Sequence, residues 1–293
     1  MEPNLVILAG GISSRMKNSA AINVPAASNL IIEAKSKAKS MIGLGASGRP
    51  FFDYLLFNAR EAGYTDIVVV VGDNDEDIRK HYGDAEYGND FYGLTISYAR
   101  QKIPAGRTKP LGTADALSCA LHSRPDWKNQ KFTVCNSDNL YSVHVFELLL
   151  DSPHPNAMID YDRDALKFEK SRIEKFAIIE TDREGWLMNI IEKPTPEELA
   201  AVKYSSGRIG VSMNIFRFSY KDIFSILGNV PLHPVRQEKE LPTAIMRMIN
   251  KSPTDRMMMT YPVAEIVPDL SEQDDIPRVQ EYLHSKYPNF TFE

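Results

Sequence analysis

Residues Leu5-Val-Ile-Leu-Ala-Gly-Gly-Ile-Ser-Ser-Arg15-Met16 form an apolar run that breaks into a loop of small residues and ends in arginine. Leu5–Leu8 is short, branched and uncharged, as is typical of a buried strand in a parallel sheet. Gly10 and Gly11 allow a tight turn, and successive free N–H groups in such a loop can cradle phosphate oxygens. Arg15 adds a fork-shaped positive charge. An ordinary strand-to-loop turn has the same composition, so the prediction of a phosphate-binding loop depends on segments further along the chain.

Length and composition exclude several classes of protein. The chain has 293 residues, enough for one large α/β domain or two small ones, and its net charge of −5 argues against a nucleic-acid partner. No apolar stretch approaches the ~20 residues that span a bilayer, and the N-terminus lacks the basic-then-apolar order of a signal peptide. We therefore expect a cytoplasmic protein without a membrane partner. Cys119 and Cys135 are expected to be reduced, and the six histidines lack zinc-ligand spacing.

The first half of the chain predicts strands that alternate with helices. Phe51–Ala62 has apolar residues at helical spacing and is followed by Gly63, a typical helix end. Asp66–Gly72 and Lys131–Cys135 are β-branched or apolar runs that indicate buried strands. We also expect a helix at Ile78–Tyr82, a strand at Leu94–Ala99 and a helix at Thr113–Leu121. This alternation favours a mostly parallel central sheet flanked by helices.

The second half predicts an antiparallel insertion that covers one side of the binding cleft. Strand-like runs at Ile173–Glu180 and Trp186–Glu192 surround Thr181-Asp-Arg-Glu-Gly185, a hairpin pattern. Further elements are a strand at Val211–Phe218 and helices at Leu241–Asn250 and Pro277–Lys286. The sequence has no hexapeptide repeat of the kind that would indicate an appended β-helix domain. Lys17–Lys39 is polar and poorly patterned, which predicts a functional or disordered loop.

Two segments carry groups suited to a nucleotide. Ala34–Lys39 is basic, and a lysine from the loop after the first strand could reach a phosphate, although a solvated basic loop has the same composition. In Pro110-Leu-Gly112-Thr-Ala-Asp115, Gly112 permits close backbone approach and Thr113 is a predicted N-cap. This turn could hold a planar base with the amide of Gln101 at its edge, or could be an ordinary helix start.

Two further segments carry carboxylates. Asn136-Ser-Asp138-Asn139 follows a buried strand, where open α/β sheets bind ligands, and a carboxylate there suits Mg²⁺. An Asx-turn leaving the strand is the alternative. Glu192-Lys193-Pro194 ends the hairpin, where the carboxylate could bind a sugar hydroxyl and the lysine a phosphate.

These motifs follow one another along the chain in an order that is informative. They are Leu8-Ala-Gly-Gly11 with Arg15, Lys39, Leu111-Gly-Thr-Ala114, Asp138-Asn139 and Glu192-Lys-Pro194. Phe51-Phe-Asp-Tyr-Leu-Leu56, Ser212-Met-Asn214 and Glu240-Leu-Pro-Thr-Ala244 extend the pattern over most of the chain. In this order they resemble sugar-1-phosphate nucleotidyltransferases. The resemblance implies a Rossmann-like, nucleotide-diphospho-sugar transferase fold similar to GT-A glycosyltransferases. It further implies a single domain over residues 1–293, with a nucleotide-binding half (1–140), a sugar-phosphate-binding half (141–270) and a C-terminal helix (271–293).

The family's reaction joins an NTP to a sugar 1-phosphate and expels pyrophosphate. By resemblance, the nucleotide-binding residues are Leu8, Ala9, Gly10, Gly11, Gln101, Gly112 and Thr113. The implied catalytic residues are Arg15 at the leaving pyrophosphate, Lys39 at the α-phosphate and Asp138 as a Mg²⁺ ligand. Glu192, Lys193 and Asn214 would bind the sugar phosphate, and Asp269 is the best match to a second metal carboxylate. In-line phosphoryl chemistry needs alignment and charge neutralisation rather than a protein nucleophile.

The chain departs from the family pattern near the loop lysine and in the sugar pocket. Ala38 stands where a proline usually precedes the lysine, and the gap after Arg15 is longer than usual, so Lys37 is an alternative to Lys39. Asn214 stands where many members have glycine, and the tryptophan usual near Asp269 is missing.

Other functions stay open at this stage. The first loop also resembles molybdenum-cofactor guanylyltransferases, and choline-phosphate cytidylyltransferases share the fold, so phosphocholine or molybdopterin acceptors are alternatives. A non-catalytic nucleotide-sensing homologue is another. A GT-A glycosyltransferase would typically have Asp-x-Asp where this chain has Asn136-Ser-Asp138. UTP or dTTP is expected because the Gly112 segment and Gln101 resemble pyrimidine-using members.

Overall fold

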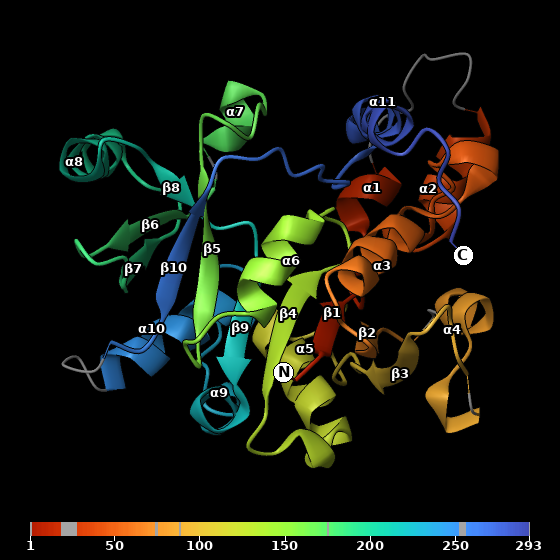
Figure 1. Ribbon diagram of the computed structural model, residues 1–293, viewed down its shortest axis with the longest axis horizontal. Coiled ribbons are helices and arrows are strands. Elements are labelled where there is room, and N and C mark those ends of the chain that lie inside the picture. The colour runs from red at the N-terminus through yellow and green to blue at the C-terminus, as the bar shows by residue number, and fades with distance from the viewer. Residues whose placement is uncertain are drawn as a thin grey trace.

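The central feature of the fold is one mixed sheet. A computed structural model describes residues 2–18, 28–73, 76–87, 89–174, 176–251 and 256–292, and within them ten strands pair into this sheet. The strands are β1 (Asn4–Leu8), β2 (Asp66–Val71), β3 (Thr95–Arg100), β4 (Lys131–Asn136), β5 (Ala157–Asp162), β6 (Ile178–Thr181), β7 (Leu187–Ile191), β8 (Gly210–Val211), β9 (Ile215–Ser219) and β10 (Met259–Val263). Their order is β3-β2-β1-β4-β9-β5-β8-β6-β7, with β10 beside β5 (Figure 1).

The direction of the strands divides the sheet into two parts. β3, β2, β1 and β4 run parallel, as predicted from the first half of the sequence. β9 is antiparallel to both β4 and β5, and β6 and β7 form the predicted hairpin. The predicted fold class, a mostly parallel α/β sheet with an antiparallel insertion, is therefore confirmed.

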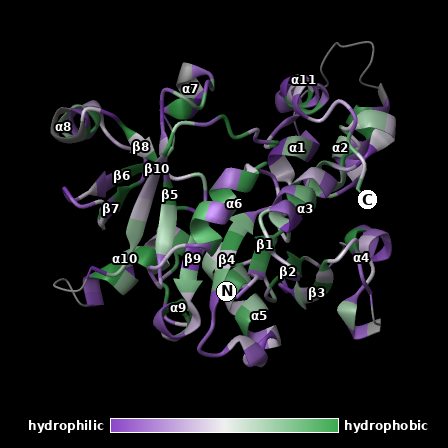
Figure 2. Cartoon of the chain, viewed as in Figure 1, coloured by the Kyte–Doolittle hydropathy of each residue, from purple (hydrophilic) through white to green (hydrophobic). Residues whose placement is uncertain are grey.

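Helices cover both faces of the sheet. The α-helices are α1 (Ser14–Asn18), α2 (Ser28–Ser36), α3 (Phe51–Glu61), α4 (Glu76–Tyr82), α5 (Thr113–Ser123), α6 (Val143–Leu150), α7 (Lys170–Ile173), α8 (Pro196–Ser206), α9 (Tyr220–Leu227), α10 (Leu241–Lys251) and α11 (Ile276–Lys286). Figure 2 shows hydrophobic residues gathered on the central strands, whereas α4 and α11 carry many hydrophilic ones. No helix in the described ranges has the length and apolarity that a membrane crossing requires.

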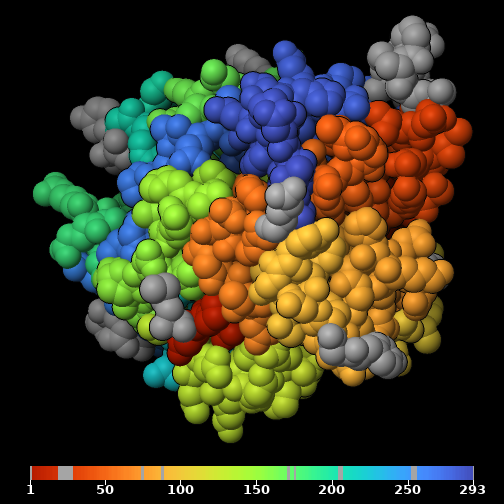
Figure 3. All heavy atoms as spheres, turned by 45° about the vertical axis from the view of Figure 1, so that its right-hand side comes forward, coloured from red at the N-terminus to blue at the C-terminus, as the bar shows by residue number. Residues whose placement is uncertain are grey.

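Alternation along the buried strands creates two hydrophobic cores. On β1, Leu5 and Ile7 belong to one core and Val6 to the other, because successive side chains of a strand point to opposite faces. The first core packs against α3, α6 and α11, and the second against α5, α9 and α10. The C-terminal tail after α11 lies against the orange and yellow segments of the first hundred residues (Figure 3). Within it, Phe292 is buried in the first core and stacks on the exposed Tyr92.

Three predicted elements were wrong in extent. The predicted strand Ile173–Glu180 begins only at Ile178, because the amides of Arg172 and Ile173 bond to Glu169 O and form the short helix α7. The predicted strand Val211–Phe218 is divided into β8 and β9, since Asn214 has a left-handed backbone (φ +57°). The predicted loop Lys17–Lys39 contains α2, while residues 19–27 lie outside the described ranges.

A buried ion pair links β5 to the segment before β8. Asp160 is 4% exposed and forms an ion pair with Arg208. Gly210 makes room for it, since a Cβ there would lie 1.8 Å from Asp160 Oδ1. Burial outweighs the attraction of Arg208 and raises the pKa of Asp160 to about 6.

This pKa predicts a stability gain on mild acidification. The folded state binds the Asp160 proton more tightly than the unfolded chain, whose Asp pKa is about 3.9. Between pH 7 and pH 5, the free energy of unfolding of the wild type should therefore rise by about 1 kcal/mol relative to that of Asp160→Asn. Urea unfolding of both proteins at the two pH values measures this difference. Parallel pH profiles would contradict it.

Candidate active site

One cavity of about 670 Å³ opens at the carboxyl ends of β1 and β4. Its walls come from the loop after β1, the turn before α3, the start of α5, the segments after β4, β7, β8 and β10, and the loop that leads into α10. Every site residue predicted from the sequence lines it: Leu8, Ala9, Gly10, Gly11, Arg15, Lys39, Gln101, Gly112, Thr113, Asp138, Glu192, Lys193, Asn214 and Asp269. Lys37, the alternative to Lys39, is not among the lining residues.

Pairing of β1 with its neighbours fixes the glycine loop at the mouth of the cavity. Ala9 N donates to Val70 O (2.8 Å) and Ser137 N to Leu8 O (3.1 Å), so the chain separates from the sheet at Gly10. A Cβ at Gly11 would meet no atom within 4 Å, so this part of the loop is open to a ligand. Helix α1 then begins at Ser14 and carries Arg15 on its first turn.

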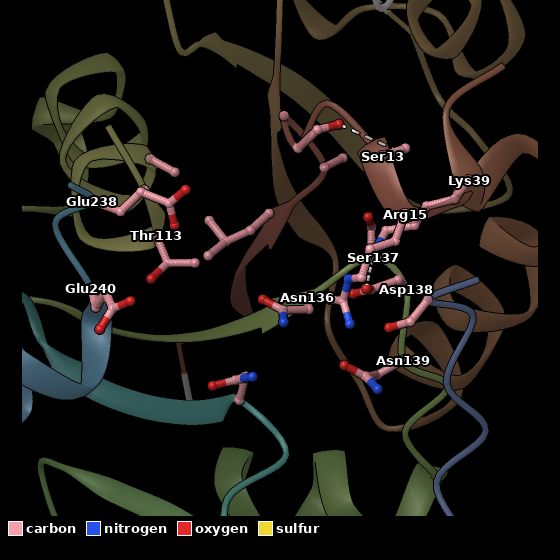
Figure 4. A pocket seen from close by; sticks show the side chains of 18 of the residues that line it. Ser13, Arg15, Lys39, Thr113, Asn136, Ser137, Asp138, Asn139, Glu238 and Glu240 are labelled. Carbon is pink, nitrogen blue, oxygen red and sulfur yellow. Dashed lines mark hydrogen bonds and ion pairs between the residues drawn. The ribbon is translucent and has the colours of Figure 1, made fainter. Parts of the chain in front are cut away.

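Lys39 faces the carboxylate that follows β4. It lies on a short 3-10 turn, Lys39–Met41, and its Nζ forms an ion pair with Asp138 Oδ2 (Figure 4). Lys37 instead forms an ion pair with Glu33 of α2 at 2.9 Å. Glu33 also accepts a hydrogen bond from Gly43 N (2.8 Å), which ties α2 to the far end of the Lys39 turn. The geometry therefore favours Lys39 over Lys37 as the cavity lysine.

Asp138 and Asp269 are brought together by backbone pairing. Asn139 and Asp269 form an isolated antiparallel bridge, and Leu270 N donates to Asp138 O at 2.8 Å. Burial and the negative charge of Asp138 raise the pKa of Asp269, whereas the nearby Arg172 opposes the shift. Asp269 Oδ1 is buried and lies 2.8 Å from a guanidinium nitrogen of Arg172. Two adjacent carboxylates fit the hard ligand set of Mg²⁺.

The start of α5 is capped by the main chain of Lys239 rather than by the side chain of Thr113. Gly112 is the N-cap residue, so the predicted N-cap role of Thr113 was wrong. Thr113 Oγ1 instead accepts a hydrogen bond from Leu241 N (2.9 Å), and Ala114 N donates to Lys239 O (3.0 Å). Lys239 O thus accepts from an N-terminal amide of α5 that a side-chain cap would otherwise satisfy, and Thr113 Oγ1 accepts from the first amide of α10.

Gln101 lines the same end of the cavity but is engaged within the protein. It is 3% exposed, and its Nε2 donates to Gly112 O (2.9 Å) and to Asp115 Oδ2 (2.8 Å). The two hydrogens of its amide are therefore used to hold the Gly112 turn, and only its Oε1 acceptor would be left for the edge of a base.

Three non-glycine residues that line the cavity have left-handed backbones. They are Ser13 (φ +53°), Lys193 (φ +51°) and Asn214 (φ +57°). Such conformations cost free energy and gather at ligand sites. Asparagine tolerates this region better than most residues, which explains how Asn214 can replace the glycine of many family members.

Arg236 is a site residue that the sequence analysis missed. Its guanidinium forms ion pairs with Glu192 and with Glu240, where Nε lies 2.5 Å from Oε1. Burial and the charge of Glu192 raise the pKa of Glu240. The spacing of Arg236 and Glu240, four residues apart just before α10, is the signal that could have found the pair, but the segment is a loop.

Glu192, Glu240 and His233 also place ligand atoms within 4.8 Å of one another. His233 Nδ1 accepts hydrogen bonds from Val235 N and Arg236 N (both 3.1 Å), so the neutral ring keeps its proton on Nε2. Arg236 already forms ion pairs with both carboxylates. We assign no metal to this cluster.

Comparison with known proteins identifies the family. Residues 34–259 match the nucleotidyl transferase family, which is most of the chain. The chain belongs to this family. It is 24% identical over 272 residues to the bifunctional protein GlmU of Staphylococcus haemolyticus, covering 91% of this chain but only 50% of that protein. The chain therefore spans about half the length of this curated relative.

Two solved structures have the same fold as this nucleotidyl transferase. One is a candidate glucose-1-phosphate thymidylyltransferase from Bacillus anthracis in complex with sucrose (TM-score 0.67, 16% identity, 98% of this chain and 97% of that one). The other is a UDP-glucose pyrophosphorylase complexed with UDP-glucose (TM-score 0.68, 18% identity, 98% of this chain and 100% of that one). At these identities the likeness establishes the fold alone.

The contact between Gly112 and Lys239 O predicts a specific stability loss. Gly112 has φ +107°, and a Cβ there would lie 2.6 Å from that oxygen. Gly106 also has positive φ (+79°) but open space around it, so Gly106→Ala gives the cost of a Cβ at positive φ without a close contact. We expect Gly112→Ala to lower the unfolding free energy by about 2 kcal/mol more than Gly106→Ala, because it adds an overpacked contact in a backbone conformation (φ +107°, ψ −174°) that is essentially restricted to glycine. Equal losses in thermal or urea unfolding would contradict this.

Proposed function

We propose that this protein transfers a nucleotidyl group from an NTP to a sugar 1-phosphate, giving an NDP-sugar and pyrophosphate in a Mg²⁺-dependent reaction. The supporting observation is the distribution of charge in one cavity. Lys39, Asp138 and Asp269 gather near the glycine loop, whereas Glu192 and Arg236 lie across the cavity near α10. A cavity of about 670 Å³ has room for two phosphorylated substrates between these groups.

The proposed chemistry is an in-line displacement at phosphorus. A phosphate oxygen of the sugar 1-phosphate forms a bond to the α-phosphorus of the NTP, and the bond from that phosphorus to the bridging oxygen breaks as pyrophosphate leaves. Lys39 neutralises the α-phosphate and Arg15 the leaving pyrophosphate. Lys193, with Arg236, holds the phosphate of the sugar, and Glu192 accepts hydrogen bonds from sugar hydroxyls. These residues align the two substrates and neutralise the charge of their phosphates, and none of them needs to act as a nucleophile.

Asp138 and Asp269 would hold the Mg²⁺ ion. Bound there, the ion would supply positive charge to the phosphates of the nucleotide. Gly10, Gly11 and Gly112 offer backbone groups to the nucleotide, for which UTP and dTTP are our expected substrates. The two similar structures, a candidate thymidylyltransferase and a pyrophosphorylase complexed with UDP-glucose, agree with a pyrimidine base.

Pyrophosphate release tests the proposed function directly. The four common NTPs and dTTP are crossed with a panel of sugar 1-phosphates and phosphocholine, in Mg²⁺ and in EDTA. Release that requires one sugar phosphate and is lost in Asp138→Ala supports the proposal. Pyrophosphate release with phosphocholine alone would mean that the acceptor is phosphocholine and not a sugar 1-phosphate. Nucleotide binding without turnover under every metal tested would overturn catalysis in favour of nucleotide sensing.

The two candidate lysines give a matched pair of variants. Lys39 pairs with Asp138 inside the cavity, and Lys37 pairs with Glu33 on α2. Lys39→Gln should lower kcat/KM by about 100-fold or more, the usual effect of losing one preorganised group at developing charge. Lys37→Gln removes the same charge two residues away and should leave kcat/KM within a few-fold of wild type. Equal losses of kcat/KM in the two variants would contradict this, because they would mean that the net positive charge of the segment matters and the position of Lys39 does not.

A further inference from the structure

Arg172 lies between two carboxylates at the edge of the cavity. One nitrogen of its guanidinium is 2.8 Å from Asp269 Oδ1, and another donates to Asp275 Oδ1. The guanidinium also lies over the ring of Phe168, 4.9 Å from its centroid. Asp275 is itself fixed, since its Oδ2 accepts hydrogen bonds from Ser271 N (2.8 Å) and Glu272 N (2.9 Å). The Arg172 side chain is therefore fixed by these contacts and does not rotate freely.

Each carboxylate of the Asp138–Asp269 pair already has a cationic partner in this structure. Asp138 is paired with Lys39, and Asp269 with Arg172. Asp269 is only 9% exposed, and a buried carboxylate needs a counter-charge to remain ionised. A divalent cation at Asp269 would meet the guanidinium at the same oxygen and would be repelled by its like charge. Binding of the cation and retention of the ion pair are therefore in competition.

We propose that Arg172 is the resident counter-cation of Asp269, which a divalent cation must displace before it can use that carboxylate. The metal role of Asp269 rests on the proposed function, whereas the Arg172–Asp269 pair does not. Arg172 is thus a positioning residue that acts through Asp269 and lowers the affinity of the free protein for divalent cations. It keeps the cavity charge-balanced when no metal is bound.

Mn²⁺ binding to the free protein tests this proposal without any substrate. Free Mn²⁺ is measured by electron paramagnetic resonance for wild type, Arg172→Gln and Arg278→Gln. Arg278 is a matched control, because it pairs with the same Asp275 (3.5 Å) and lies over the same Phe168 ring (4.6 Å) as Arg172 does. The ion pair to Asp269 belongs to Arg172. A third variant, Arg172→Gln with Asp269→Asn, removes the carboxylate as well.

We expect Arg172→Gln to bind Mn²⁺ about tenfold more tightly than wild type, which corresponds to about 1.4 kcal/mol. Arg278→Gln should stay within twofold of wild type, and the double variant should lose the gain. A merely structural role for Arg172 would lower Mn²⁺ affinity or leave it unchanged. Equal affinity of Arg172→Gln and wild type, an equal gain in Arg278→Gln, or no Mn²⁺ binding by either protein at millimolar concentrations would overturn the proposal.

Hydrogen exchange of the wild type covers the case in which Arg172→Gln fails to fold. Saturating Mn²⁺ should speed amide exchange in residues 168–173, because the ion pair that fastens α7 is released. Unchanged exchange there would overturn the proposal. Pyrophosphate release by the wild type is scored separately, so failure of Mn²⁺ competition leaves the transferase proposal standing, and absence of turnover leaves the Mn²⁺ result interpretable.

Discussion

The parallel pairing of β1 between β2 and β4 is the constraint on which the site depends. Leu8 is in register with Val70 on one side and with Asn136 on the other, so all three strands end at one edge of the sheet. The glycine loop leaves β1 at that edge, and Asp138 follows β4 two residues beyond it. Carboxyl ends of parallel strands form the usual ligand crevice of open α/β sheets. A shift of this register would separate the glycine loop from the carboxylate of Asp138.

Opposite charges held in pairs organise the cavity that this register creates. Lys39 with Asp138, Arg172 with Asp269, and Arg236 with Glu192 form three ion pairs around the same space. Each pair stabilises groups that would otherwise be costly to desolvate. Substrate phosphates and a divalent cation would exchange these internal partners for new ones. The charged groups of these three pairs therefore each have an oppositely charged partner before any ligand binds.

The parallel half could be predicted from local sequence patterns, and the residues around the cavity from the resemblance to nucleotidyltransferase motifs. Uninterrupted apolar runs marked β1, β2 and β4, and motif residues cluster where those strands end. β5 and β10 were missed, since Asp160 and Pro262 interrupt an apolar strand pattern and the two strands depend on pairing with each other. Arg172 and Arg236 were missed for a related reason. Each is a single residue outside the recognised motifs, and tertiary folding brings Arg172 to Asp269 and Arg236 to Glu192.

The last part of the chain determines how firmly the first part holds its ligands. Asp269 lies beside Asn139, and a few residues later Gln273, fully buried, donates from Nε2 to Met16 O (2.8 Å) in α1, the helix that carries Arg15. Helix α11 then runs to a tail whose Tyr287 bonds to Asn58 on α3 (Nδ2 to Oη, 2.8 Å). Phe51 at the start of α3 in turn donates to Ile42 O beside the Lys39 turn (3.1 Å). The positions of Arg15 and Lys39 thus depend on contacts made by residues 269–287, which lie more than 200 residues further along the chain, so a substitution there can change phosphate binding without touching a substrate.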